Sequence, residues 1–492
     1  MIIRIPDLLN QKEDGHPLFL FTKKVSLQPF IQHPCHFIIK KVTLFIPMKM
    51  NRKSKFISLL LFSGILVALS TLIFSGCNDK VEITQKYTMM EPVYLTPAEL
   101  RSSFEISVPQ KVTSTGKIYL YQNYIFLNEP GEGIHIIDNS DKENPETISF
   151  IQIPGNYEMA ARGNRIFADS YLDLVVLDIT DPTNVTLTNR IENIFLELAQ
   201  QNQYYDAENG IIVDYEPREV VEVHEGEFNG AFPSYYYYGN SIGFRGEFSS
   251  IDMAMSSFAP ESTPVVQTGI GGSMARFTIM KERLYSIDNQ NMMVFNISDL
   301  DNPVPGAQLN IGWGIETIFP YEDNIFIGSQ SGMLIYDNSD PDFPVHLSTF
   351  EHIRSCDPVV VENDIAYVTL RSGNNCRNGF TNQLDVIDVS NLRNPELLKT
   401  YPMTNPHGLG IEHGILFICE GEAGLKVFNA TDIYSISENL LAYFGDIHAF
   451  DVIPYNDNLI LVGEDGLYQF DYSDPENIHF LSMIPISREQ AM

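Results

Sequence analysis

Seven polar residues recur at one fixed position in this sequence of 492 residues. Each stands eight residues before the first apolar residue of a short hydrophobic run, such as the runs that begin at Ile325 and Ile365. The set consists of Lys117, Glu158, Arg276, Thr317, Asp357, His407 and Asp451. Six of the seven can carry charge, and charged side chains bind polar ligands or pair with one another. We therefore take this set, which we call the polar ring, as the candidate binding site.

Motifs for catalysis are weak by comparison. The repeated part of the chain contains no HExxH, P-loop, CxxC or Gly-x-Ser-x-Gly sequence. His407, His448 and Asp357 form one set that could bring a metal ion or a general base to the polar ring. The prediction includes no catalytic residue, no metal and no cofactor, and it favours a binding protein over an enzyme.

Seven acidic turns mark the elements that must position the polar ring. Each has the form Asp/Asn-x-Ser/Thr-Asp/Asn, as in Asp337-Asn338-Ser339-Asp340. Such side chains accept backbone N–H bonds two residues on, and a following Pro stops the strand. We interpret the turns as structural. Calcium loops are the alternative, but they require alternating ligands and a closing Glu, which are missing here.

The spacing of these turns predicts the architecture. Most turns are 40 to 51 residues apart, and a typical unit has four apolar runs, at residues 315–319, 324–329, 333–337 and 345–350. Four short strands repeated at about 41 residues are typical of a propeller blade. The sequence predicts an all-β fold: a seven-bladed β-propeller with four-stranded blades over residues 103–484. The polar ring then lies at the mouth of the central channel.

One gap of 118 residues between turns contains an insertion at residues 191–272. Residues 211–215 and 219–223 alternate in polarity and predict a hairpin that turns at Glu216-Pro217-Arg218. A tyrosine run at residues 235–238 could stack on sugars or peptides, or could pack the insertion onto the propeller. In an antiparallel blade the fourth-to-first and second-to-third connections share one face, which we call the channel face. The insertion is such a connection and could form a lid there, and Trp313 belongs to the same face.

Ring closure has alternatives. Residues 103–109 could pair as an outer strand of the last blade, although residues 478–484 already have the pattern of its fourth strand. An eight-bladed ring, with the insertion hairpin as a partial blade, is a second possibility.

The cysteine positions predict one disulfide. Cys356 and Cys376 both fall on the channel face of one blade, where they can meet. Cys419 lies inside an apolar strand and predicts a buried free thiol.

The repeat resembles a known family. Its nearest matches are Leu174-Val175-Val176-Leu177-Asp178-Ile179 and Leu384-Asp385-Val386-Ile387-Asp388-Val389, which are similar to the LVIVD repeat. Two copies depart from the pattern with Asn296 and Asn429 in place of Asp. The resemblance covers residues 117–484 and implies a β-propeller, often a lipoprotein of Bacteroidetes-type bacteria. It implies no established activity, and no catalytic residue can be carried over.

The N-terminal region predicts export. Basic residues at 50–55 precede an apolar run at residues 56–74, and Ser75-Gly76-Cys77 follows, which resembles the lipobox of bacterial lipoproteins. The resemblance implies cleavage before Cys77 and lipidation of its thiol; a transmembrane anchor is the alternative. Residues 1–47 then form a doubtful leader, 48–76 a signal peptide, 77–102 a tether and 485–492 a tail. The expected location is the cell envelope, with the protein lipid-anchored in the outer membrane and facing the periplasm or the surface.

Charge limits the partners. The chain has a formal net charge of -32, and residues 77–492 contain 21 Lys and Arg against 60 Asp and Glu. Such a surface repels nucleic acid and anionic lipid. The leading prediction is an envelope binding or scaffold module for a glycan, a peptide or a protein partner at the channel face. An extracytoplasmic hydrolase or lyase with its site at the channel mouth is the alternative, and a purely structural envelope protein is a third.

Overall fold

The computed structural model describes residues 81–226, 270–271, 273–352, 358–372 and 382–487. The chain divides into two units. The described part of the smaller unit is residues 81–91 and 215–226, and the larger unit contains the rest. Within the described residues, no helix combines the length and the apolar character that a membrane crossing requires.

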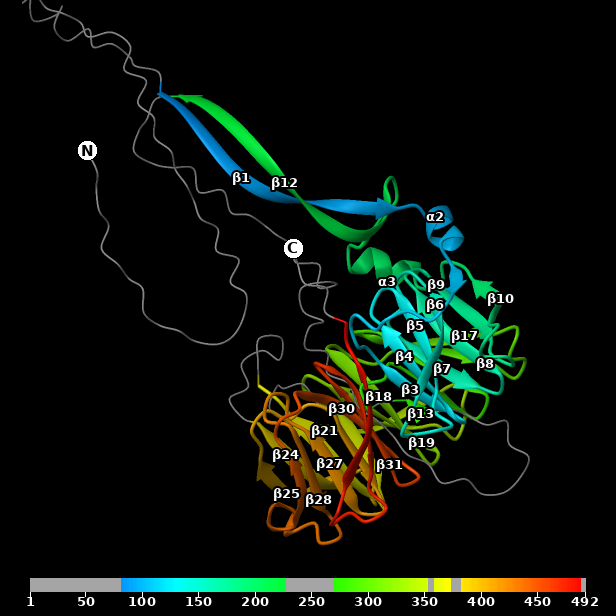
Figure 1. The fold of residues 1–492 in the computed structure, drawn as a ribbon, viewed down its shortest axis with the longest axis vertical. Helices are drawn as coiled ribbons and strands as arrows, with labels where there is room; N and C mark the ends of the chain where they lie inside the picture. The colour runs from blue at the N-terminus through cyan, green and yellow to red at the C-terminus, as the bar shows by residue number, and fades with distance from the viewer. Residues whose placement is uncertain (1–80, 227–269, 272, 353–357, 373–381, 488–492) are drawn as a thin grey trace, which may run out of the picture. The chain divides into compact units, whose positions relative to one another are not determined.

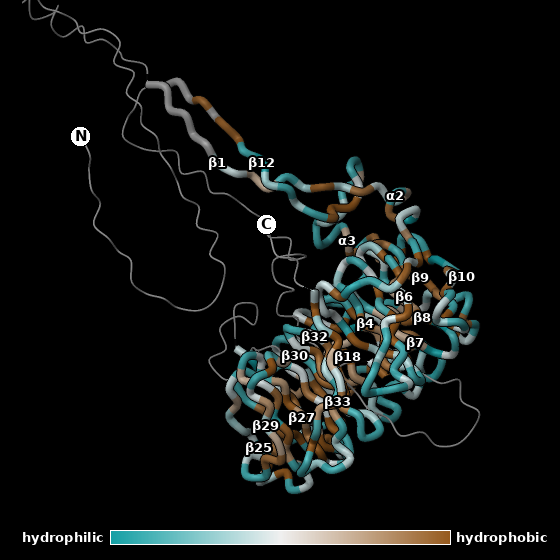
Figure 2. Tube along the Cα trace, viewed as in Figure 1, coloured by the Kyte–Doolittle hydropathy of each residue, from teal (hydrophilic) through white to brown (hydrophobic). Residues whose placement is uncertain are grey.

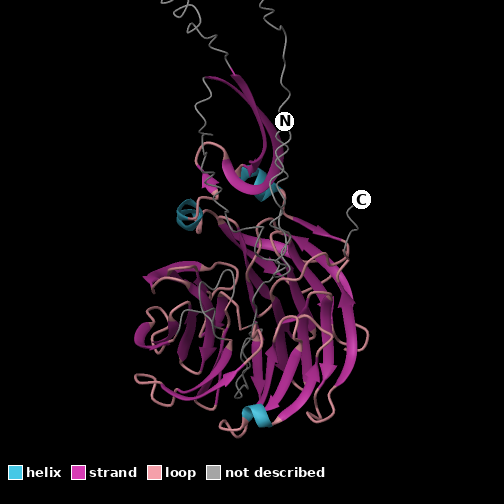
Figure 3. Ribbon diagram, turned by 90° about the vertical axis from the view of Figure 1, so that its left-hand side faces the viewer, coloured by secondary structure: helices cyan, strands magenta, loops and turns pink. Residues whose placement is uncertain are grey.

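Seven antiparallel sheets make up most of the larger unit in the described chain (Figure 1, Figure 3). In each sheet four consecutive strands pair in chain order. The first three sheets contain β3 (Ile118–Tyr121), β4 (Tyr124–Glu129), β5 (Gly133–Asp138) and β6 (Glu146–Gln152); β7 (Met159–Arg162), β8 (Arg165–Ser170), β9 (Asp173–Asp178) and β10 (Thr186–Ile191); and β14 (Phe277–Met280), β15 (Arg283–Ile287), β16 (Asn291–Asn296) and β17 (Val304–Asn310).

The other four sheets repeat the arrangement. They contain β18 (Ile315–Tyr321), β19 (Asn324–Ser329), β20 (Gly332–Asp337) and β21 (Val345–Glu351); β22 (Val359–Glu362), β23 (Ile365–Leu370), β24 (Gln383–Asp388) and β25 (Glu396–Pro402); β26 (Leu409–Glu412), β27 (Ile415–Cys419), β28 (Leu425–Asn429) and β29 (Leu440–Phe444); and β30 (Ala449–Tyr455), β31 (Asn458–Gly463), β32 (Gly466–Asp471) and β33 (His479–Pro485). The predicted all-β repeat of four strands is confirmed.

The fourth sheet shows why these residues form strands. β19 is buried along its whole length, as expected for a strand covered on both faces, whereas β21 is mostly exposed or half-buried. After β20, Asp337 Oδ1 accepts a hydrogen bond from the Ser339 N–H at 2.8 Å. The same bond recurs after the third strand of the other six sheets. The structural role predicted for the acidic turns is therefore confirmed.

Hydrophobic clusters join each sheet to the next. One cluster spans sheets one to three, a second joins three and four, a third spans four to six, and a fourth joins six and seven. A fifth packs Ile453 and Val462 of the last sheet against Ile118 and Leu127 of the first. Figure 2 shows these hydrophobic residues concentrated along the strands. The sheets thus form a propeller-like repeat whose two ends are in contact.

Hydrogen bonds reinforce the contact between the last and first sheets. The Ser487 N–H donates to Val112 O at 2.7 Å, and Gln469 Nε2 donates to Asn139 Oδ1 at 2.7 Å. No strand is exchanged between these sheets among the described residues. β2 (Glu105–Ser107) pairs with β6, the fourth strand of the first sheet. The alternative in which residues 103–109 join the last sheet is therefore wrong, since β33 is the fourth strand there.

The predicted insertion hairpin is also wrong. β12 (Gly210–Gly226) is one continuous strand through Pro217, and it pairs with β1 (Val81–Leu95) and β11 (Tyr205–Asp206). Residues 77–102, predicted as a tether, therefore contain β1 and α2 (Pro97–Ser102). The hairpin cannot be a partial blade, because its strand belongs to a separate three-stranded sheet. In the smaller unit Arg218 pairs with Glu91 at 2.9 Å.

A small cap packs on the second sheet of the larger unit. α2 starts at a capping box, in which Thr96 and Glu99 exchange hydrogen bonds, and its Leu100 is fully buried against Leu172 and Ala199. Ala199 belongs to α3 (Leu196–Gln201), the first element of the insertion. The only other described helix is η2 (Ile436–Glu438), a single 3-10 turn in the sixth sheet's third connection. The described insertion thus begins with a packed structure on the channel face.

Candidate functional site

The first strands of neighbouring sheets lie next to one another around the axis. β3 contacts β7, β7 contacts β14, and the series continues through β18, β22 and β26 to β30. The free edge of β3 pairs with β13 (Ile270–Gly271), the end of the insertion, with Gly271 opposite Tyr119. A strand on that edge lies on the axial side of the first sheet. The insertion therefore returns through the centre of the repeat.

The residues that follow β13 cross this central space. Ser273 is fully buried and donates from its Oγ to Leu409 O in the sixth sheet, at 3.3 Å. Met274 packs in the cluster of sheets four to six, and Ala275 O accepts a hydrogen bond from the Ile318 N–H at 3.0 Å. We call residues 270–271 and 273–276 the axial segment. The axial segment occupies the space where the sequence predicted the mouth of the central channel.

Three members of the polar ring form one connected cluster. Lys117 Nζ lies 3.3 Å from Glu158 Oε1, and the Arg276 N–H donates to Glu158 Oε2 at 3.0 Å. Lys117 also donates to Met274 O in the axial segment. Arg276 Nε donates to Glu316 O at 3.2 Å. Glu158 is thus the centre of an ion-paired cluster that ties sheets one, two and three to the axial segment.

Asp451 lies close to this cluster and is fully buried. Neither of its carboxyl oxygens makes a hydrogen bond within the described chain. Burial raises the pKa of Asp451 well above its usual range, and the Val452 N–H and the Lys117 ammonium oppose this rise. Burial also lowers the pKa of Lys117, which Glu158 opposes. These four residues thus lie near one another, with Glu158 and Asp451 buried and Lys117 and Arg276 half-buried.

Among the remaining members of the polar ring, His407 has a different set of partners. Thr317 and His407 are buried, and Asp357 lies outside the described residues. His407 Nε2 is 3.1 Å from Asn405 Nδ2 and 3.4 Å from the guanidinium of Arg371. Burial lowers the pKa of His407, and Arg371 and His448 add to this effect. His407 therefore belongs to a second polar group, formed by the fifth, sixth and seventh sheets.

The predicted His407, His448 and Asp357 set is only partly described. The rings of His407 and His448 lie 5.7 and 4.6 Å from the ring of Phe450, which lies beside both. His448 Nδ1 is 2.6 Å from Glu464 Oε2. The described part of the chain contains no group of three or more His, Cys, Asp or Glu side chains placed to hold a metal ion. Both histidines thus pack against one aromatic ring, and Asp357, the third member of the set, lies outside the described residues.

Sequence reasoning missed the support beneath Glu158. Asp169 Oδ1 accepts hydrogen bonds from the N–H groups of Tyr157 and Glu158, at 2.7 and 2.9 Å, and from Asn156 Nδ2 at 2.9 Å. Burial raises the pKa of Asp169 to about 7, although these hydrogen bonds oppose the rise. The equivalent residue is apolar or Gly in most other repeats, so no repeat-wide pattern indicated it.

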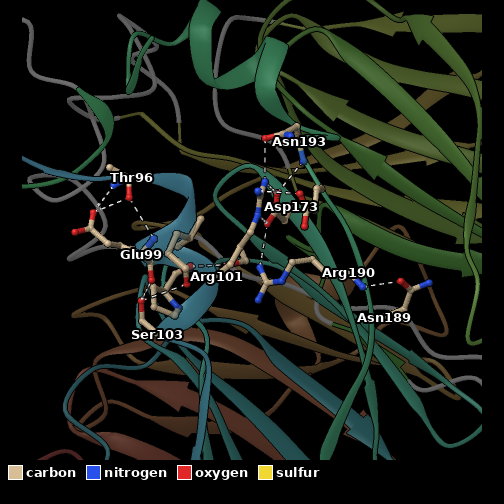
Figure 4. Close-up of polar contacts among 12 residues, drawn as sticks. Thr96, Glu99, Arg101, Ser103, Asp173, Asn189, Arg190 and Asn193 are labelled. Atoms are coloured by element: carbon tan, nitrogen blue, oxygen red, sulfur yellow. Dashed lines mark hydrogen bonds and ion pairs between the residues drawn. The ribbon is translucent and has the colours of Figure 1, made fainter. Parts of the chain in front are cut away.

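A second missed site is the anchor of α2 (Figure 4). The carboxylate of Asp173 is fully buried between Arg101 and Arg190, with N–O distances of 2.9 and 3.1 Å. The Asn193 N–H also donates to Asp173, at 2.8 Å. Burial alone would raise the pKa of Asp173, but the hydrogen bonds from Arg101 and Asn193 outweigh it and leave the pKa below its usual value. This network holds the start of the insertion on the second sheet.

The predicted cysteine sites are described in part. Cys419 is a buried free thiol in β27, as predicted, and burial raises its pKa well above the usual value. Cys356, Cys376 and Cys77 lie outside the described residues, as does the tyrosine run at 235–238. The proposed disulfide and the lipidation site therefore stay predictions.

Comparison with protein families finds the LVIVD repeat in two segments, residues 159–192 and 379–403. The first segment coincides with β7 to β10, so one repeat corresponds to one four-stranded sheet. The two sequences that suggested the resemblance, at residues 174–179 and 384–389, lie inside the two matches. The predicted repeat family is confirmed. A search of curated proteins found no match.

Solved structures with a similar arrangement were also found. The computationally designed Ika8 protein has 9% identity and a TM-score of 0.43, over 77% of this chain and 88% of that one. Saccharomyces cerevisiae Sqt1 has 8% identity and a TM-score of 0.42, over 80% and 89%. A protein of unknown function from Desulfotomaculum acetoxidans has 12% identity and a TM-score of 0.39, over 75% and 95%. These TM-scores are below 0.5. The strand pairing within the chain alone shows the fold.

Proposed function

We propose that this LVIVD-repeat chain is a closed, seven-bladed β-propeller that serves as a lipid-anchored binding module of the cell envelope. Its partner is a glycan, a peptide or a protein, and recognition takes place on the channel face. The observation that carries this proposal is the axial segment, which contacts the first strands of the first, fourth and sixth sheets. With the centre occupied by the chain itself, a partner must bind on a surface.

The closed ring of seven blades is supported by the clusters between sheets. Each of the seven four-stranded sheets in the described chain shares a hydrophobic cluster with the next, and the last shares one with the first. A ring of this kind leaves few exposed strand edges and holds its connecting loops at fixed positions. Loops held on a rigid scaffold are the usual carriers of binding residues.

The choice of the channel face is supported by what it carries. α3 and β11, at the start of the insertion, belong to a fourth-to-first connection, and Trp313 belongs to the next one along the chain. The opposite face carries the seven acidic turns, whose carboxylate and amide side chains accept hydrogen bonds from their own backbone. Those groups form hydrogen bonds within their own turns, so we place recognition on the channel face.

Anchoring to the envelope is supported by the sequence around Cys77. A basic start, an apolar run of about 19 residues and Ser75-Gly76-Cys77 together favour a lipoprotein signal. The strongly negative domain that follows would be repelled by anionic lipid, so a covalent lipid is the more effective way to hold it at a membrane.

Site-specific photo-crosslinking tests the proposed function. A photoreactive phenylalanine derivative, which keeps an aromatic ring, is placed in the full-length protein either at Trp313 on the channel face or at Phe343, a similarly exposed residue on the opposite face. The two variants are then irradiated in intact envelopes of the native cells. We expect adducts of defined mass from position 313 and none from position 343. Adducts from neither position, or equal adducts from both, would contradict recognition on the channel face.

A further inference from the structure

Trp313 is the one tryptophan in the sequence, and 65% of its surface is exposed. It lies between β17 and β18, in the connection from the third sheet to the fourth. Tryptophan offers the largest apolar side-chain surface, and exposing it without a partner gives up favourable burial. An exposed tryptophan on the face proposed for recognition therefore needs an explanation.

The backbone around Trp313 is held in place on both sides. The Ile311 N–H donates to Gln290 O at 2.8 Å, and the Ile315 N–H donates to Asn289 O at 3.2 Å. On the other side, the Gln330 N–H donates to Gly314 O at 2.8 Å. The second-to-third loops of the third and fourth sheets thus bracket the Trp313 connection, and the indole is presented from a fixed position.

Two glycines shape this connection. Gly312 and Gly314 have φ angles of 134° and 71°, which lie in the region that favours glycine. A Cβ atom at Gly314 would also lie 3.1 Å from the Cβ and Cγ atoms of Gln330. The Gln330 side chain therefore packs directly beside the Trp313 connection. The sequence Gly-Trp-Gly is what allows the indole to stand clear of its neighbours.

The segments around the indole are polar and carry one charged side chain. Asn289, Gln290 and Gln330 are half-buried, and their side-chain amides make no hydrogen bond within the described chain. The charged side chain, Asp288, is half-buried and accepts hydrogen bonds from the Gln290 and Asn291 N–H groups at 2.6 and 2.8 Å. Beside the indole, these segments therefore offer mainly neutral donors and acceptors.

We infer that Trp313 is the stacking platform of a subsite for a neutral saccharide, a claim that rests on the proposed binding function and names its ligand class. The C–H face of a pyranose ring packs on an indole, and sugar hydroxyls both donate and accept, as the amides of Asn289, Gln290 and Gln330 do. The chain's net charge of -32 disfavours acidic saccharides. The three neutral amides favour a saccharide over a charged peptide, whose recognition relies on ion pairs.

Because Trp313 is the single tryptophan, fluorescence excited at a wavelength selective for tryptophan reports on this subsite alone. The full-length protein is titrated with cellohexaose, mannohexaose, xylohexaose and chitohexaose. We expect at least one of these sugars to shift the emission to shorter wavelength saturably and to protect the indole from acrylamide quenching. If all four leave both emission and quenching unchanged, the inference is overturned.

Variants locate the binding on this surface. For the sugar that gives the signal, calorimetry should show affinity at least about tenfold weaker in Trp313→Ala and partly restored in Trp313→Phe. Gln330→Ala should weaken the fluorescence response, and Phe343→Ala is the matched control with wild-type affinity. Equal affinity in Trp313→Ala and wild type would overturn the subsite. Photo-crosslinks from position 313 without any response to sugar would retain the proposed function and remove the saccharide.

Discussion

At the scale of single residues, some charged side chains of this protein stabilise the fold. Asp173 is an example, because its buried carboxylate has two guanidinium partners and a backbone N–H donor. A buried charge is costly unless it is paired in this way. Arg101 closes the network from α2 and also reaches Glu192 at 2.8 Å.

Replacing Arg101 tests the value of this anchor. Arg101→Ala removes the bidentate partner of a fully buried carboxylate, and we expect a loss of about 2 kcal/mol in the free energy of unfolding. Arg218→Ala is the matched control, because Arg218 and its partner Glu91 are both exposed; that change should cost less than about 0.5 kcal/mol. Urea denaturation measures the free energy of unfolding of both variants. Equal losses would show that the Asp173 network does not stabilise the fold.

Asp169 gives a prediction for pH. Its folded pKa of about 7 lies above the usual aspartate value of 3.8, so between these values the folded state binds more protons than the unfolded state. This group therefore lowers stability as the pH rises from about 4 to about 7, by at most about 1.4 kcal/mol per pH unit. Asp169→Asn should flatten that part of the stability curve, measured by urea unfolding at several pH values. An unchanged slope would contradict the raised pKa.

Part of the site could be predicted from the sequence. The fixed spacing placed Lys117, Glu158 and Arg276 on first strands, and the structure joins them in one cluster. The spacing could not show that the axial segment covers them, because that contact depends on where the end of an 82-residue insertion returns. Met274 and Ser273 carry no sign of this role, since each is a single residue outside the repeat.

At the scale of elements, the repeated strands were predictable and the irregular ones were not. The turn bonds recur in all seven sheets, so one pattern fixed their boundaries. β12 was predicted as a hairpin because Glu216-Pro217-Arg218 interrupts its alternation. A strand tolerates Pro where it has only one paired neighbour, since no ladder hydrogen bond is lost. Its partner β1 contains apolar and aromatic residues such as Val81, Ile83 and Tyr87, but the polar residues and Pro92 among them led to the tether prediction.

The axial segment makes a further prediction at this scale. Met274 is buried in the cluster of sheets four to six, so Met274→Ala should lower the free energy of unfolding by about 2–4 kcal/mol. Met90→Ala is the control, because Met90 is half exposed, and its effect should be within about 0.5 kcal/mol. Chemical denaturation of both variants measures these changes in the free energy of unfolding. A Met274→Ala protein as stable as wild type would show that the segment is not packed at the axis.

At the scale of the whole molecule, we propose a lipid-anchored propeller that presents one face to a partner. Cys77→Ser tests the anchor. The wild-type protein should incorporate labelled palmitate in its native cells, and Cys77→Ser should not, because it lacks the thiol that carries the lipid. Cys419→Ser, which removes a buried thiol, should keep the label. A wild-type protein without label would instead support a transmembrane segment at residues 56–74.

The claim on which the location of binding depends is that the chain fills its own axis. Gly271 and Tyr119 are directly opposite on antiparallel strands, a separation that suits a disulfide. In the double variant Tyr119→Cys with Gly271→Cys, mass spectrometry of the oxidised full-length protein should find a peptide linked through positions 119 and 271. Neither single variant should give that peptide. Its absence from the folded double variant would contradict an axis filled by the axial segment and would reopen the central channel as the binding site.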